Sequence, residues 1–187
     1  LSAGPLTTIQ DKGRYGYMRY GITTSGVLDD KAYTYGNALL GNPDGEACLE
    51  MTVKGAAIQF AGTGAIAITG ADMVPHINGA VVPVNQRIEI ADGDVLELGF
   101  AGKGLRAYLC VEGGIDVPLV YGSRSTNLKC GFGGFHGRKL QDGDVLSTCP
   151  VAEYRRKAWG LPKEYQLPQD GGMTIRVISG TQDDMFT

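Results

Sequence analysis

The sequence predicts a mainly β protein of short antiparallel strands, with one short helix near residues 29–40. Glycine supplies 29 of the 187 residues, well above the usual share of about 7%. No Gly-X-Y period accompanies these glycines, so they indicate many tight turns rather than a collagen helix. Short apolar runs lie between the turn signals, a pattern typical of an antiparallel barrel or sandwich.

The expected strands follow one another closely along the chain. Asn78-Gly79 stands between two apolar runs and is a strong hairpin signal. Similar glycine-containing turns, such as Asp92-Gly93, separate the other runs. The expected strands cover residues 6–10, 47–53, 56–61, 65–69, 81–83, 87–90, 95–100 and 106–112.

A single helix is expected at DDKAYTYGNALLG, residues 29–41. Asp29 is a suitable N-cap, and Gly41 is a natural residue to end the helix. Gly36 inside the helix costs about 1 kcal/mol relative to alanine. We therefore expect Gly36 to allow close packing of the helix against a sheet.

A short repeat connects two distant parts of the chain. IADGDVLEL at 90–98 and LQDGDVLST at 140–148 share the run Asp-Gly-Asp-Val-Leu. Two copies are too few for a solenoid, and the flanking residues lack the rest of a calcium loop. The repeat predicts two equivalent turns that lead into equivalent strands.

The sequence predicts a β-rich, barrel-like domain over residues 1–150. Residues 151–171 carry no strand pattern and read as a linker, with Pro162 and Pro168 and the basic run at 155–157. An apolar run then begins, so residues 172–187 are expected to be the start of a second, truncated β-rich domain.

Charge and cysteine pattern exclude several classes of protein. A formal net charge of −3 argues against a broad nucleic-acid surface, which needs a basic stripe. No apolar run approaches 18 residues, so no membrane span is expected. The four cysteines never form CxxC, and His76 and His136 lie 60 residues apart, so no metal site is predicted. Scattered thiols fit a reducing, cytoplasmic setting, and no secretory signal pattern is visible.

The strongest candidate site is GSRSTNLKCGFGGFHGR, residues 122–138. Arg124 offers a planar fork of donors for a carboxylate or phosphoryl group. Small hydroxyls surround it, and uncovered backbone N–H groups at the glycines would form an anion-binding nest. The expected substrate-binding residues of this segment are Ser123, Ser125, Thr126, Gly133 and Gly134. The alternative is a long irregular connection in which Arg124 only pairs with an acid such as Glu112 or Asp116.

Two further charged residues are candidates. Glu50 lies in the middle of an expected strand, where an interior carboxylate must be paired or face a site; alternatively it lies on a solvent face. Arg14 follows Asp11 by three residues across a turn. The two residues either form a local ion pair or present Arg14 to a site, which makes Arg14 a substrate-binding candidate.

Several sequence blocks occur together in one order. They are GPLTTIQDKGRYGY, GITTSGVLDDKAY, NALLGNPDGEACLE, AITGAD, RAYLCVEGGIDV, GSRSTNLKCGFGG and GRKLQDGD. In combination they resemble the biotin-dependent carboxyltransferase family, which includes allophanate-hydrolase subunit 2-like proteins, the C subunit of 5-oxoprolinase and the KipA type. The resemblance covers roughly residues 2–187 and corresponds to the N-terminal half of such proteins. It implies a cyclophilin-like β-barrel.

The resemblance also implies function. One branch implies the C subunit of an ATP-dependent 5-oxoprolinase, which opens 5-oxoproline to glutamate with an A subunit and a KipI-like B subunit. A second implies a carboxyltransferase of urea or allophanate metabolism, with carboxybiotin on a partner. A third implies a non-enzymatic KipA-like regulator of a KipI-like partner. The chain has no P-loop, so ATP would be used through the complex.

The resemblance adds two amide residues to the candidate site. Asn37 and Asn42 fall within the block NALLGN, and Glu50 lies in the block that follows. We expect at least one of the three to face the same cleft as Arg124. Arg124 and Glu50 are the expected catalytic residues, and Asn37 and Asn42 are expected to bind substrate. Asn42 has the alternative role of a turn residue after the helix.

Overall fold

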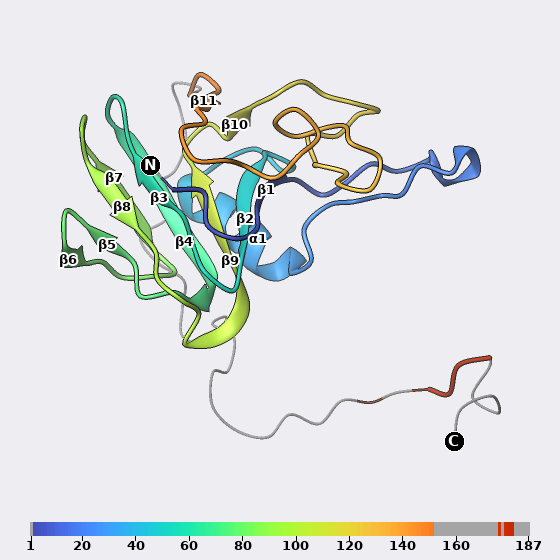
Figure 1. The fold of residues 1–187 in the computed structure, drawn as a ribbon, viewed down its shortest axis with the longest axis horizontal. Coiled ribbons are helices and arrows are strands. Elements are labelled where there is room, and N and C mark those ends of the chain that lie inside the picture. Colours follow the sequence, from blue (N-terminus) through green and yellow to red (C-terminus); the bar gives the residue numbers. More distant parts are fainter. Residues whose placement is uncertain (1, 152–175, 177, 182–187) are drawn as a thin grey trace.

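The computed structural model describes residues 2–151, 176 and 178–181. Its elements are short, and most strands follow one another directly along the chain (Figure 1). They are β1 (Thr7–Gln10), η1 (Met18–Tyr20), α1 (Asp30–Leu40), β2 (Cys48–Thr52), β3 (Ala57–Gln59), β4 (Gly64–Asp72), β5 (His76–Ile77), β6 (Ala80–Val81), β7 (Arg87–Ile90), β8 (Val95–Glu97), β9 (Lys103–Val111), β10 (Ile115–Asp116) and β11 (Ser147–Thr148).

The strands form antiparallel sheets around the long strands β4 and β9. Five strands pair in the order β1-β2-β9-β4-β7, four in the order β3-β8-β5-β6, and β10 pairs with β11. Helix α1 lies across the five-stranded sheet against β4 and β9. The four-stranded sheet shares a core with the opposite face. The pairings among the described residues do not join into one closed ring of strands.

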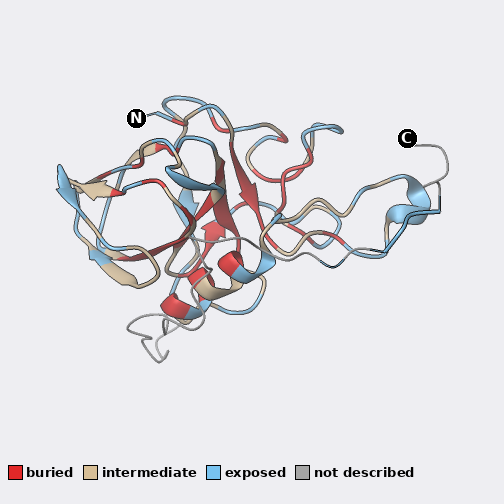
Figure 2. Ribbon diagram, turned by 90° about the horizontal axis from the view of Figure 1, so that it is seen from below, coloured by how far each residue is buried: buried red, intermediate tan, exposed pale blue. Residues whose placement is uncertain are grey.

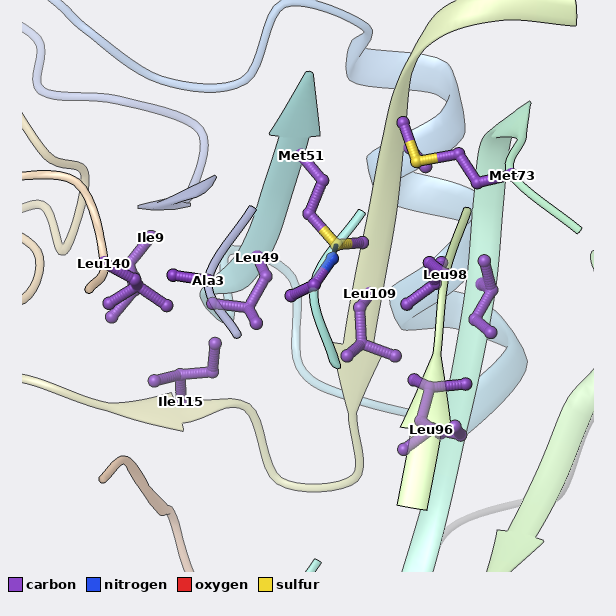
Figure 3. Close-up of a cluster of buried hydrophobic side chains, with 14 of the residues drawn as sticks. Ala3, Ile9, Leu49, Met51, Met73, Leu96, Leu98, Leu109, Ile115 and Leu140 are labelled. Carbon is purple, nitrogen blue, oxygen red and sulfur yellow. Dashed lines mark hydrogen bonds between the residues drawn. The ribbon is translucent and has the colours of Figure 1, made fainter. Parts of the chain in front are cut away.

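Alternation along the strands separates two cores. In β9, Ala107 and Leu109 enter the core between the sheets, whereas Tyr108 and Cys110 point toward the helix. Figure 3 shows Leu109 in the larger core with residues of both sheets, among them Leu96. Burial follows the same layers (Figure 2), so the five-stranded sheet is covered on both faces.

Helix α1 begins and ends where the sequence predicts. Asp29 accepts a hydrogen bond from the amide of Ala32 at 3.0 Å, and Gly41 ends the helix in the left-handed conformation with φ of 69°. A Cβ atom at Gly36 would lie 2.6 Å from Cys110 Sγ. The close packing expected of Gly36 is therefore confirmed, because only glycine brings the helix this near to β9.

The Asp-Gly-Asp repeat forms two equivalent turns, as predicted. In each copy the first aspartate accepts from a distant backbone N–H: Asp92 from Gly62 at 2.7 Å and Asp142 from Ala3 at 2.8 Å. The second aspartate accepts from the amide three residues before it, at 2.8 Å in both copies. The strands that follow are not equivalent, in contrast to the prediction: β8 begins directly after Asp94 within the four-stranded sheet, whereas β11 begins two residues after Asp144 and pairs with β10.

The second repeat carries an ion pair that makes stability depend on pH. Arg138 donates two hydrogen bonds to Asp144, at 2.7 and 2.9 Å, and these lower the pKa of Asp144 to about 2. The unfolded value is about 3.9, so the carboxylate contributes its stability above that pH and loses it as pH falls toward 2. We expect Asp144→Asn to be less stable than the wild type at pH 7, measured by urea unfolding. The difference should fall by about half at pH 3; an equal difference at both pH values would contradict this reading.

The segment between β1 and α1 leaves the body of the protein. Residues 12–28 extend outward, with η1 at the far end (Figure 1). Tyr15, Met18 and Tyr20 are exposed there, and η1 buries no residue. We call residues 12–28 the arm.

The predicted class is confirmed: the protein is mainly antiparallel β with one α-helix over the expected residues. The Asn78-Gly79 hairpin is also confirmed, with positive φ at both residues between β5 and β6. Strands β5, β10 and β11 lie outside the expected strand ranges, because two-residue strands leave no periodic pattern. The predicted linker at 151–171 and second β-rich segment at 172–187 lie almost wholly outside the described residues. In the described part, no helix combines the length and apolar character that a membrane span requires.

Candidate functional site

The segment 122–138 docks on the free edge of β1. Thr126 donates to the carbonyl of Ile9 from both its amide and its hydroxyl, each at 2.9 Å. One residue pair further along, the amide of Asp11 donates to Ser125 Oγ at 2.9 Å. The loop thus completes the hydrogen bonding of an edge strand, which fixes its position relative to the sheet.

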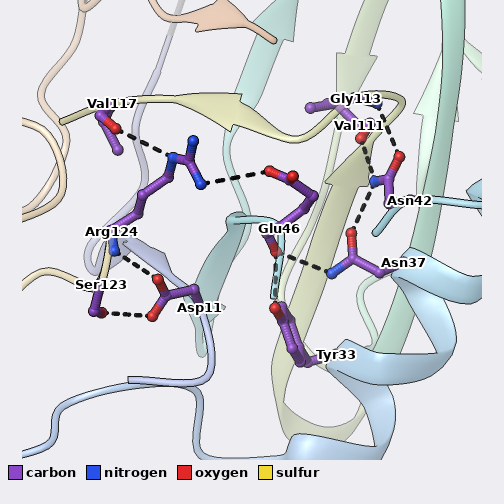
Figure 4. A network of polar contacts seen from close by, with 10 residues as sticks. All are labelled: Asp11, Tyr33, Asn37, Asn42, Glu46, Val111, Gly113, Val117, Ser123 and Arg124. Carbon is purple, nitrogen blue, oxygen red and sulfur yellow. Dashed lines mark hydrogen bonds and ion pairs between the residues drawn. The ribbon is translucent and has the colours of Figure 1, made fainter. Parts of the chain in front are cut away.

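Asp11 is the main anchor of the Ser-Arg-Ser run. Its Oδ1 accepts from the hydroxyls of Ser123 and Ser125 at 2.7 and 2.5 Å. Its Oδ2 accepts from the backbone amide of Arg124 at 2.6 Å (Figure 4). Ser123, Ser125 and Thr126 are all buried. Their hydroxyls hold the loop in place, so their expected contact with substrate stays a prediction.

Arg14, near the start of the arm, binds the same loop. It is only 1% exposed, and it donates to the carbonyls of Ser125 and Val120. Its guanidinium lies 4.9 Å from the ring centre of Phe132. Burial lowers the pKa of Arg14, and the charge of Asp11 opposes this shift. Asp11 and Arg14 therefore each bind the loop through hydrogen bonds of their own, and the substrate contact expected of Arg14 stays a prediction.

Gly133 and Gly134 let the end of the loop lie directly on its beginning. A Cβ atom at Gly133 would lie 2.2 Å from the Ser125 carbonyl oxygen, and one at Gly134 would lie 1.9 Å from Thr126 Oγ1. The amide of Gly134 donates to the carbonyl of Arg124 at 2.9 Å. This amide is therefore engaged within the loop, in contrast to the uncovered nest that the sequence suggested.

The Arg124 side chain leaves the loop and reaches toward the sheet. Nε donates to the carbonyl of Val117 at 3.2 Å, and Nη1 lies 3.6 Å from Oε2 of Glu46. The alternative reading predicted an acid beside Arg124; that acid is Glu46, while Glu112 pairs with Arg87 at 2.9 Å. The Arg124 side chain is 22% exposed. An arginine has five N–H donors, so donors remain for a planar anion or an amide carbonyl.

Glu46 joins Arg124 to the two predicted asparagines (Figure 4). Its carbonyl accepts hydrogen bonds from Asn37 Nδ2 at 3.1 Å and from Tyr33 Oη at 2.9 Å. Asn37 Oδ1 in turn accepts from Asn42 Nδ2 at 2.8 Å. Asn37, Asn42 and Arg124 are thus parts of one polar network, which we call the Glu46 network.

Asn42 also serves the turn after α1. Its Nδ2 donates to the carbonyl of Val111 at 2.8 Å, and its Oδ1 accepts from the amide of Gly113 at 2.9 Å. These bonds tie the end of the helix to the end of β9. Asn42 therefore has both roles: it stabilises the turn after the helix, and it belongs to the Glu46 network.

Glu50 lies elsewhere, beside the N-terminus of α1. Its Oε2 accepts from the amide of Leu28 at 2.9 Å and from Tyr108 Oη at 2.8 Å, and its Oε1 lies 3.4 Å from Arg106 Nε. Tyr108 Oη also accepts from the amide of Asp29. The carboxylate is paired, as expected of an interior acid, and these bonds hold the end of the arm to the sheet. Its catalytic role stays a prediction.

A metal centre has no obvious ligand set within residues 2–151. In that range no three or more His, Cys, Asp or Glu side chains gather as a metal site. Cys48 and Cys110 are buried free thiols under the helix. The chemistry that the arrangement offers is hydrogen bonding and charge from Arg124, held at its base by Asp11 and at its tip by Glu46.

Comparison with known proteins identifies the family. The model of the carboxyltransferase domain, subdomains A and B, matches residues 20–187. The chain belongs to this carboxyltransferase family. The resemblance read from the sequence blocks is thereby confirmed.

Relatives come from two systems. The chain is 40% identical to the C subunit of 5-oxoprolinase from Escherichia coli over 186 residues, which is all of this chain and 58% of that protein. It is also 40% identical to urea amidolyase of Lachancea kluyveri, over 96% of this chain and 10% of that protein. The crystal structure of the Kluyveromyces lactis urea carboxylase superposes with a TM-score of 0.86 at 35% identity, over 91% of this chain and 16% of that one.

Two residues of the candidate site are not predicted from the sequence. The sequence presents Asp11 only as an ion-pair candidate, although Asp-x-Gly before an extended segment signals a turn whose carboxylate binds backbone amides. Glu46 gave no signal, because it follows a turn cluster and meets Arg124 only through folding over 78 residues of sequence.

Proposed function

We propose that this protein acts as the C subunit of an ATP-dependent 5-oxoprolinase, which opens 5-oxoproline to glutamate. The observation that carries the proposal is 40% identity to the Escherichia coli C subunit along the entire chain. The chain spans 58% of the length of that relative. The complete active unit is proposed to include the A subunit of 5-oxoprolinase and a KipI-like B subunit, in the cytoplasm.

In this proposal Arg124 binds the anionic part of the substrate. Opening the lactam places negative charge on its carbonyl oxygen, and 5-oxoproline also carries a carboxylate. A guanidinium fork suits either group, and stabilisation of developing charge is often the largest contribution to catalysis. The Glu46 network holds the fork, with Asn37 and Asn42 behind it. Their contacts favour a supporting role for Arg14, Ser123, Ser125, Thr126, Gly133 and Gly134.

ATP enters this proposal through the complex. ATP would transfer its terminal phosphoryl group to the lactam carbonyl oxygen and leave as ADP. Water would then add to the carbonyl carbon, the lactam C–N bond would break, and phosphate would leave as the glutamate carboxylate forms. The residues of this chain would orient the lactam during these steps. Arg124 would keep the substrate's negative charge in one place and so favour a single reactive geometry. Glu50 remains a candidate catalytic residue in this proposal. Its side chain lies at the end of the arm, where it accepts from the amide of Leu28.

A second candidate function is carboxyl transfer to urea or a similar amide. It is favoured by the 40% identity to urea amidolyase and by the superposition on urea carboxylase. Biotin would then be attached to a partner domain. Both candidates share an amide-type substrate and an anionic activated group, so Arg124 has the same task in each.

The test is ATP-dependent glutamate release from 5-oxoproline by the protein mixed with the A and B subunits. The proposal predicts release that needs all three proteins. Urea-dependent loss of carboxyl from carboxybiotin, without glutamate release, would transfer the assignment to the second candidate. Release of equal rate from the A and B subunits alone would remove the proposed role of this chain.

A further inference from the structure

We infer that Asp11 is a positioning residue for Arg124, a role that depends on the proposed function of Arg124. Asp11 lies at the end of β1, and its side chain accepts from three consecutive residues of the loop. The bonds to Ser123 and Ser125 flank the bond to the Arg124 amide. The backbone of Arg124 is therefore fixed on both sides by one carboxylate.

The position of Asp11 connects this carboxylate to the rigid sheet. Asp11 is 5% exposed and follows β1 directly. On the neighbouring rung, Ile9 binds both the amide and the hydroxyl of Thr126. Ser125 and Thr126 are thus both hydrogen-bonded to the end of β1 or the residue after it, and Arg124 is the residue that precedes them.

The Arg124 side chain is then held at two ends. Asp11 fixes its backbone, while Val117 and Glu46 contact the guanidinium at 3.2 and 3.6 Å. The contact with Glu46 is longer than a hydrogen bond. The guanidinium thus has one hydrogen bond, to Val117, and a longer ion pair with Glu46, so its direction also depends on where Asp11 places the Arg124 backbone.

Asparagine cannot replace this carboxylate. The aspartate accepts a backbone amide on each oxygen: Gly13 N–H at Oδ1, at 2.7 Å, and Arg124 N–H at Oδ2, at 2.6 Å. The serine hydroxyls also donate to Oδ1. In Asp11→Asn the NH₂ group therefore faces either the Gly13 amide or the Arg124 amide, and a backbone N–H can only donate. In one orientation the NH₂ group pushes the Arg124 backbone away, and in the other it pushes Asp11 away from its own turn at Gly13.

The first test follows Arg124 itself. In arginine-¹⁵N-labelled protein, the Nε–H signal of Arg124 is assigned by its loss in Arg124→Lys. We expect Asp11→Asn to shift this signal and to speed its exchange with water. Asp142→Asn is the control, because Asp142 also accepts a backbone amide, from Ala3, and lies outside the site. An unchanged Arg124 signal in Asp11→Asn would overturn the positioning role.

The second test uses glutamate release by the assembled complex. Asp11→Asn should lower kcat/KM tenfold or more in the wild-type background, but less than threefold in Arg124→Lys, because Asp11 acts through Arg124. Asp142→Asn should leave kcat/KM within twofold. Equal losses from Asp11→Asn in both backgrounds would overturn the inference.

The two readouts separate the possible failures. If Arg124→Lys retains full activity, the proposed function of Arg124 fails, while the Nε–H signal still decides whether Asp11 positions it. If Asp11→Asn does not fold, Asp11→Glu replaces it, since it keeps the charge but moves the carboxylate by one methylene. It is expected to show the same change in the Arg124 signal, and an unchanged signal would count against the role.

Discussion

Replacing Arg124 with lysine is expected to lower kcat/KM of the assembled complex tenfold or more, about 1.4 kcal/mol of transition-state stabilisation. Lysine keeps the charge but loses the planar fork that can hold a carboxylate or phosphoryl group with two parallel bonds. The melting temperature should stay nearly constant, because the Arg124 side chain is partly exposed and its contact with Glu46 is long.

The matched control is Arg19→Lys, which makes the same exchange on the exposed arm. It should leave both kcat/KM and melting temperature unchanged. Full turnover by Arg124→Lys, or a defect confined to stability, would mean that the loop is only scaffold.

Replacing Gly134 with alanine is expected to lower the free energy of unfolding by about 3 kcal/mol. Gly134 has φ of 53°, and an added Cβ atom would lie 1.9 Å from Thr126 Oγ1 and 3.0 Å from Thr126 Cβ. Thr126 cannot move aside freely, because its hydroxyl and amide both bind Ile9. Urea unfolding of the purified variants measures this change.

Gly131→Ala separates the steric effect from the backbone effect. Gly131 lies in the same loop with φ of 68°, but nothing lies within 4 Å of its added Cβ atom. It should cost only about 1 kcal/mol, the usual penalty for a left-handed alanine. Equal losses at the two positions would show that Gly134 does not hold the two ends of the loop together.

The parts of the fold that depend on local chemistry could be read from the sequence. Asp29 and Gly41 define the helix because capping involves only neighbouring residues. Asn78-Gly79 marks its hairpin for the same reason, since both residues take the positive φ that a two-residue turn demands.

The arrangement of the sheets was harder to predict. Alternation within β9 assigns its residues to two faces, but it does not say which strands become neighbours. The fourth and ninth strands pair across about 40 residues of sequence. A turn signal predicts only the pairing of strands that are adjacent in sequence, so it could not predict this one.

The candidate site shows the same division between local and distant information. Arg124 and its glycine-rich surroundings stand out in the sequence, and the structure brings Asn37 and Asn42 into one network with Arg124. The use of Ser123 and Ser125 could not be foreseen, because it depends on Asp11, a residue more than a hundred positions away that meets them only in the fold.

Binding of the substrate by Arg124 can be measured by titrating the assembled complex with 5-oxoproline in a calorimeter. We expect saturable binding by the wild type and a dissociation constant at least tenfold higher for Arg124→Lys, with Arg19→Lys unchanged. Equal affinity of the wild type and Arg124→Lys for 5-oxoproline would contradict it.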